Sequence, residues 1–140
     1  MRHWLQGPHR TLGWVLAAAG LFLVLAGMGH LLGVSARLAE EIEPRPRRAI
    51  VFLVWIGLFQ VLGGLLHLAA ARGVARGEPH ARTLSAAGAA VVASYAVPIL
   101  PVVFEKPNLL SLGPVAHLLI QAVLVSLLVR AGLSRRPPAA

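Results

Sequence analysis

The chain contains no cysteine among its 140 residues. That absence excludes disulfides, thiolate metal sites, iron–sulfur clusters and a cysteine nucleophile. Charge is also scarce: Asp and Glu together number 5, and charged residues make up 13% of the chain, against about 25% in an average soluble domain. Apolar residues account for 57%, and the mean hydropathy is +0.75. This composition is typical of an integral membrane protein.

Motifs of the common enzyme classes are absent as well. The sequence has no HExxH zinc-protease motif, no GxSxG nucleophile elbow, no GxxxxGK[ST] phosphate loop and no GxGxxG dinucleotide fingerprint. We therefore favour a non-enzymatic protein and predict no catalytic residue, while enzymatic activity stays open.

Four long stretches lack Asp, Glu, Lys and Arg, and each exceeds 20 residues. At about 1.5 Å per residue, such a stretch crosses a hydrocarbon core of roughly 30 Å as a helix. Helices satisfy their own backbone hydrogen bonds in lipid, which isolated strands do not. Short connections favour antiparallel neighbours. We predict an all-α, up-and-down four-helix bundle, a single transmembrane domain over 1–140, with spans at 11–34, 49–71, 83–104 and 107–129 and a flexible tail at 134–140.

The first stretch invites comparison with a secretory signal peptide. Val34, Ser35 and Ala36 resemble a small-residue cleavage site. The apolar run is longer than the roughly 7–15 residues of a signal-peptide core. We expect it to be a span, with cleavage as the alternative.

The distribution of basic residues predicts the orientation. Eight arginines lie at the termini and in the second connection, and five basic residues lie on the opposite side. The first set is Arg2, Arg10, Arg72, Arg76, Arg82, Arg130, Arg135 and Arg136. The second set is Arg37, Arg45, Arg47, Arg48 and Lys106. The positive-inside rule then places both termini in the cytoplasm of a multi-pass plasma or inner membrane protein.

The net charge of +8 and the pI near 11.9 also raise the question of nucleic acid. The arginines flank the spans instead of lining one groove or helix face, so we expect membrane lipids as partners and no nucleic acid.

Polar side chains recur at helical spacing inside the spans. Gly57, Gln60, Gly64 and His67 are three, four and three residues apart, which places them on one helix stripe. Such stripes are either packing seams, in which Gln60 hydrogen-bonds Gln121 or a carbonyl, or the walls of a ligand site. The predicted interior polar residues are Gln60, His67, Ser94, Tyr95, His117 and Gln121, and the predicted close-packing glycines are Gly29, Gly33, Gly57, Gly64 and Gly88.

Pro98 and Pro101 lie within the third span. Each removes an amide hydrogen and crowds a preceding carbonyl, which predicts a kink there. A broken helix lining a cavity is the alternative.

Three histidines in the spans raise the question of haem or metal. By helical rise, His30 and His67 differ in depth by roughly 20 Å, whereas His30 and His117 differ by some 7 Å. His30 and His117 are thus the plausible pair for a shared cofactor. Zinc sites require three or four ligands, and no carboxylate accompanies the pair. We predict no cofactor, with haem or a quinone as the alternative.

The segment Ala26-Gly27-Met28-Gly29-His30-Leu31-Leu32 and the basic entry Arg47-Arg48 into the helix containing Gly57-Leu58-Phe59 resemble the DoxX-like group of small bacterial membrane proteins. The resemblance extends to length, four spans and a glycine-rich first span. It implies a four-helix bundle, in some members attached to membrane redox systems that handle quinones. It transfers no catalytic residue.

Three functions follow as hypotheses. The first is a non-enzymatic bundle that serves as an accessory subunit of a membrane complex or binds a lipophilic small molecule. The alternative is a small oligomeric transporter or channel, its pathway near Gln60, His67, Ser94 and His117. The third is a haem- or quinone-linked redox protein. Partners are lipids and other membrane subunits or a second copy of the chain.

Overall fold

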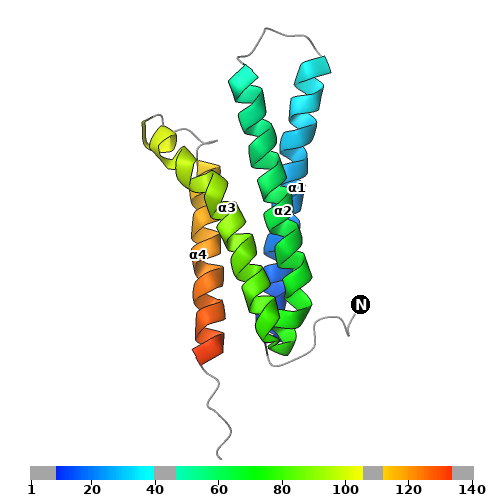
Figure 1. Ribbon diagram of the computed structural model, residues 1–140, viewed down its shortest axis with the longest axis vertical. Coiled ribbons are helices and arrows are strands. Elements are labelled where there is room, and N and C mark those ends of the chain that lie inside the picture. The colour runs from blue at the N-terminus through cyan, green and yellow to red at the C-terminus, as the bar shows by residue number, and fades with distance from the viewer. Residues whose placement is uncertain (1–8, 40–46, 106–111, 134–140) are drawn as a thin grey trace, which may run out of the picture.

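The computed structural model describes residues 9–39, 47–105 and 112–133, and these form four α-helices (Figure 1). Over these residues, the prediction of an all-helical structure with four helices is confirmed. The predicted tail and the first five residues of the fourth predicted span lie outside the described residues. The helices are α1 (Arg10–Ala39), α2 (Arg47–Arg76), α3 (Pro79–Glu105) and α4 (Leu112–Leu133).

Three of the helices are long and apolar enough to cross a membrane, over Arg10–Gly33, Ile50–Arg76 and Pro79–Pro101. The apolar part of α4, Pro114–Arg130, is shorter. Large apolar side chains cover the outer surface, and Leu25 and Leu119 are both more than 60% exposed. Apolar surface of this kind is costly in water and favourable in hydrocarbon.

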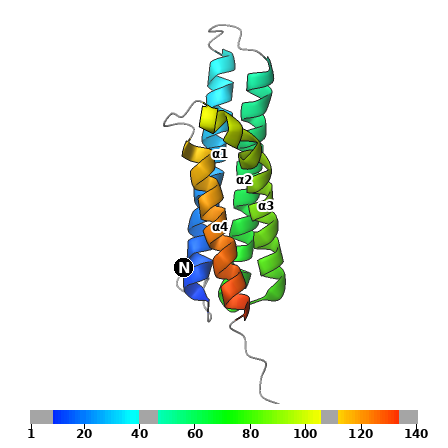
Figure 2. The same cartoon turned by 90° about the vertical axis from the view of Figure 1, so that its left-hand side faces the viewer.

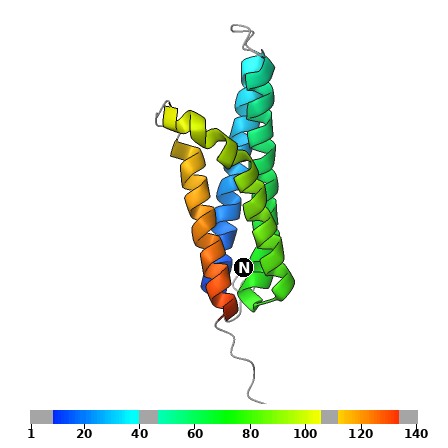
Figure 3. The ribbon, with the colours of Figure 1, turned by 60° about the vertical axis from the view of Figure 1, so that its left-hand side comes forward.

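The helices are arranged as a tight pair and a more open pair. α1 and α2 lie side by side along their length. The C-terminal end of α1 and the N-terminal end of α2 project beyond α3 and α4 (Figure 1, Figure 2). α3 packs along the lower part of α2, and its C-terminal end leans away from α2 toward α4 (Figure 3). α2 and α4 run in the same direction through the molecule (Figure 1).

Glycines repeating every seven residues bring α1 and α2 together. A Cβ on Gly20 would lie 2.8 Å from the carbonyl oxygen of Gly64, and one on Gly27 would lie 2.6 Å from that of Gly57. Both distances are shorter than van der Waals contact, so the two backbones approach as closely as they do because side chains are absent. Gly13 continues the row against Ala71 and Ala75.

The predicted packing glycines of α1 lie elsewhere. A Cβ on Gly29 or Gly33 would meet nothing within 4 Å. The contact face of α1 follows a seven-residue repeat through Gly20 and Gly27, and Gly29 is rotated about 200° from Gly27 at 100° per residue. The GxxxG pair is therefore not part of the α1–α2 contact.

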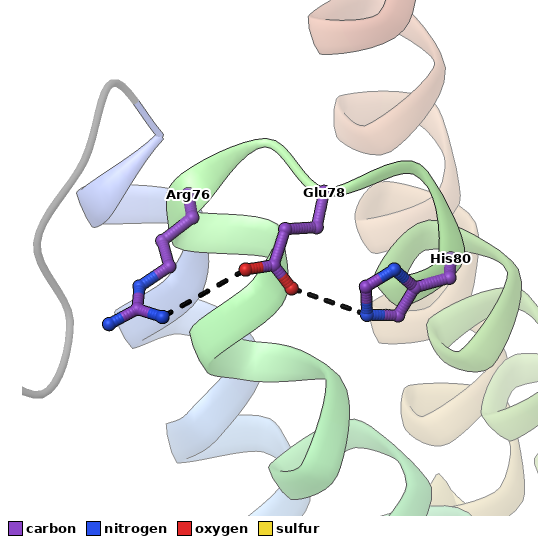
Figure 4. Close-up of polar contacts among 3 residues, drawn as sticks. All are labelled: Arg76, Glu78 and His80. Carbon is purple, nitrogen blue, oxygen red and sulfur yellow. Dashed lines mark ion pairs between the residues drawn. The ribbon is translucent and has the colours of Figure 1, made fainter.

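A glycine turn joins α2 to α3. Gly77 has φ 76°, and the amide of Glu78 donates to the Gly73 carbonyl at 2.8 Å while that of Gly77 donates to Val74 at 2.9 Å. This pattern is a Schellman cap, and Pro79 then starts α3 with no amide to satisfy. Glu78 also forms ion pairs with Arg76 (3.9 Å) and His80 (3.2 Å) (Figure 4).

Two apolar clusters hold the helices together. The first joins all four helices near the α2–α3 turn and includes Leu16, Val74 and Leu124. The second lies farther along and includes Leu23 and Val92. On α2, the polar residues described below lie between the contributions to these two clusters, so apolar side chains flank them along the helix on both sides.

Candidate functional site

Within the described residues, five buried polar side chains from three helices take part in hydrogen bonds between helices. Each is at most 7% exposed, and they are Gln60 and His67 on α2, Tyr95 on α3, and His117 and Gln121 on α4. We call these five residues the polar cluster. They make two hydrogen-bonded groups.

The first group joins α2, α3 and α4 around the hydroxyl of Tyr95. Gln60 Nε2 donates to Tyr95 Oη at 3.2 Å, and Tyr95 Oη lies 2.5 Å from His117 Nδ1. Gln60 Nε2 also lies 3.5 Å from the same ring nitrogen. His117 Nδ1 is thus the acceptor, and the ring carries its proton on Nε2. The rings of His117 and Phe22 of α1 form a T-shaped contact, with centroids 5.7 Å apart.

The second group joins α2 to α4. His67 Nε2 and Gln121 Oε1 are 2.8 Å apart, so the imidazole N–H donates to the amide oxygen. The ring of His67 fits against α3 because Gly88 has no side chain: a Cβ there would overlap the imidazole. Gly88 is therefore the position at which α3 makes room for a buried histidine.

The order of the partners follows from the helix directions. Gln60 pairs with His117 and His67 pairs with Gln121, so sequence number rises together along both helices. This register is that of two parallel helices, as α2 and α4 are in Figure 1. In the Gln60–His117 pair, α2 supplies the amide and α4 the imidazole. In the His67–Gln121 pair, α2 supplies the imidazole and α4 the amide.

Some polar atoms of the interior are left over. Within the described part of the chain, four buried side-chain atoms have no hydrogen-bond partner: Gln60 Oε1, His67 Nδ1, Ser85 Oγ and Gln121 Nε2. A buried polar atom without a partner costs on the order of 1–3 kcal/mol. Buried groups of this kind in native proteins are normally satisfied by water, an ion or a ligand.

Ser94 lies outside this cluster. It is exposed, and its hydroxyl donates to the carbonyl of Val91 at 2.7 Å, within its own helix. The buried face of α3 runs through Val92, Tyr95, Ala96 and Ile99, and at 100° per residue Ser94 falls outside that face. The small size and polarity of Ser94 did not indicate whether it lies on the buried or the exposed face of α3. Ser85, which was not among the predicted interior residues, is the buried serine of α3.

The histidine pair considered for a cofactor is split between surface and interior. His30 is exposed, and its Nδ1 lies 2.9 Å from the carbonyl oxygen of Ala26 one turn earlier. The Nδ1 of His117 is already held by Tyr95 and Gln60. Over residues 9–39, 47–105 and 112–133, no three histidine or acidic side chains are grouped so that they could hold a metal ion.

The five predicted glycines divide in the same way. Gly57, Gly64 and Gly88 lie where a Cβ would meet a neighbouring helix, whereas Gly29 and Gly33 face open space.

Comparison with family models, curated proteins and solved structures found no match to this chain.

Proposed function

We propose that this chain is an integral membrane protein that crosses the bilayer four times as an antiparallel bundle and binds a lipophilic small molecule at its polar cluster. The observation that carries the proposal is the set of partnerless buried atoms on Gln60, His67 and Gln121 in the described interior. A purely structural seam would leave these atoms paired. A ligand that enters from lipid and carries a polar group would satisfy the two glutamine amides, whereas His67 Nδ1 lies against α3 at Gly88.

The membrane topology belongs to the same proposal. α4 serves as the fourth span, and both termini face the cytoplasm of the plasma or inner membrane. Arg72, Arg76 and Arg82 support this orientation, since they lie around the α2–α3 turn, at the end of the bundle where α1 begins (Figure 1). We attribute the lean of α3 toward α4 to Pro98 and Pro101, which lie inside that helix.

The other hypotheses have less support. The channel hypothesis used Ser94 as a pathway residue, and Ser94 is on the outer surface. The haem hypothesis used His30, which is exposed and bonded to its own helix. A role as an accessory subunit is compatible with ligand binding. Membership of the DoxX-like group stays a prediction that rests on the sequence resemblance.

The proposal is tested by identifying small molecules that stay bound after gentle extraction. Native mass spectrometry compares the wild type with Gln60→Leu/Gln121→Leu and with the surface control Ser94→Ala. We expect the wild type and the control to retain the same small molecule and the double variant to lose it. Equal retention by all three proteins, or retention by none, would overturn ligand binding at the cluster.

A further inference from the structure

The two glutamines of the polar cluster leave opposite halves of their amides unused. Gln60 donates its Nε2 protons to Tyr95 and His117, and its Oε1 is left over within the part of the chain that the structure describes. Gln121 accepts from His67 with its Oε1, and here the Nε2 donor is left over. The two glutamines therefore offer one acceptor and one donor.

The two glutamines lie at levels about one helical turn apart along the bundle. Gln60 is level with His117, because their side chains meet, and Gln121 follows His117 by four residues. That spacing corresponds to about 6 Å along the helix. One hydroxyl that donates to one amide and accepts from the other spans a similar distance with two hydrogen bonds of about 2.8–3.0 Å each.

Charge on a ligand is disfavoured at this depth. The stretches that contain the cluster, 49–71, 83–104 and 107–129, have no Asp, Glu, Lys or Arg. A carboxylate or ammonium brought there would lose its hydration with no counter-ion to compensate. A neutral group that both donates and accepts meets every requirement.

We propose that the ligand is a neutral lipophile with a hydroxylated head group, whose O–H donates to Gln60 Oε1 and whose oxygen accepts from Gln121 Nε2. Monoacylglycerol is a simple member of this class. The inference rests on the proposed function and adds the chemistry of the head group.

The test compares three probes with one acyl chain: monooleoylglycerol, methyl oleate and oleate. Methyl oleate accepts hydrogen bonds but donates none, and oleate carries a charge. Binding to the full chain is measured by native mass spectrometry in an amine-oxide detergent, which has no hydroxyl to compete. We expect monooleoylglycerol to bind roughly three- to eighteen-fold more tightly than methyl oleate, the range for modest hydrogen bonds in membranes, and oleate to bind least.

Variants assign the preference to the two amides. Gln60→Leu and Gln121→Leu should each bring the ratio of the affinities for monooleoylglycerol and methyl oleate closer to one. Ser94→Ala should leave this ratio unchanged. Equal binding of monooleoylglycerol and methyl oleate to the wild type, with both lost in Gln60→Leu/Gln121→Leu, would overturn the head-group assignment and leave the proposed function standing. Failure of every probe to bind in a cluster-dependent way would overturn both. The comparison of probes on the wild type decides the head group even where a variant does not fold.

Discussion

The imidazole of His67 donates to the amide oxygen of Gln121 over 2.8 Å and thereby links α2 to α4 inside the molecule. The two residues lie 54 positions apart in the chain, and both are nearly fully buried. Replacing one partner leaves the other buried and unsatisfied, which costs more than the net gain from the bond itself.

A double-mutant cycle on this pair should show strong coupling. Gln121→Leu should lower the free energy of unfolding by about 1–3 kcal/mol, because the His67 Nε2 proton loses its acceptor. His67→Leu/Gln121→Leu should be less destabilised than the sum of the two single variants. Unfolding in mixed micelles measures each value. Additive effects would show that the two side chains do not interact.

The glycine row between α1 and α2 should tolerate no methyl group. Gly64→Ala should destabilise the protein by about 1–3 kcal/mol, because the new Cβ lies 2.6 Å from the Gly20 carbonyl oxygen. Gly29→Ala is the matched control: it meets nothing within 4 Å and should be neutral or stabilising by up to about 1 kcal/mol, since alanine favours the helix. The reverse order would mean that α1 packs through Gly29.

Removal of one hydroxyl tests the group around Tyr95. Tyr95→Phe should cost about 0.6–1.7 kcal/mol, the range of hydrogen bonds within membranes, because both His117 Nδ1 and Gln60 Nε2 lose this partner. Ser94→Ala, one residue away on the exposed face, should change the free energy of unfolding by less. Similar losses in both variants would place Ser94 in the interior.

The α2–α3 turn should depend on its backbone more than on its ion pairs. Gly77→Ala should cost about 1–2 kcal/mol, because alanine is strained at the positive φ of 76°. Glu78→Gln should change stability by less than about 1 kcal/mol, since exposed ion pairs contribute little. Thermal unfolding in detergent compares the two. A larger loss in Glu78→Gln would assign the turn's stability to charge.

Because the chain has no native cysteine, single cysteines report topology directly. Glu78→Cys, in the α2–α3 turn, should react with a membrane-impermeant maleimide only after the cytoplasmic side is exposed. Ala39→Cys, at the end of α1, should react from outside intact cells. Labelling of both positions from the same side would contradict the proposed crossing by α1 and α2.

The helices were predictable because their signal is local. Runs without charge and long enough to cross hydrocarbon indicated four helices, and α2 covers 47–76 where the run predicted 49–71. Helices continue past the last apolar residue because charged residues form the same backbone hydrogen bonds as apolar ones. Gly77 followed by Pro79 also carried a local signal, a cap and a helix start, within the sequence itself.

The partners were not predictable in the same way. As a packing residue, Gln60 was predicted to hydrogen-bond Gln121 or a carbonyl, and in the structure it meets Tyr95 and His117. On α1 the predicted packing glycines were Gly29 and Gly33, whereas the contact with Gly57 and Gly64 of α2 is made by Gly20 and Gly27. The seven-residue spacing of Gly20 and Gly27 was visible in the sequence. However, a GxxxG pair and a row of glycines spaced seven residues apart are equally compatible with one isolated helix, so the sequence did not show which of them makes the contact.

The sequence by itself determined that this chain forms helices, three of them long and apolar enough to cross a membrane, because that property depends only on residue type and run length. Tertiary structure decided which glycines touch, which serine is buried, and that His67 is level with Gln121. Those relations depend on the rotation and offset of one helix against another, and no single helix contains that information.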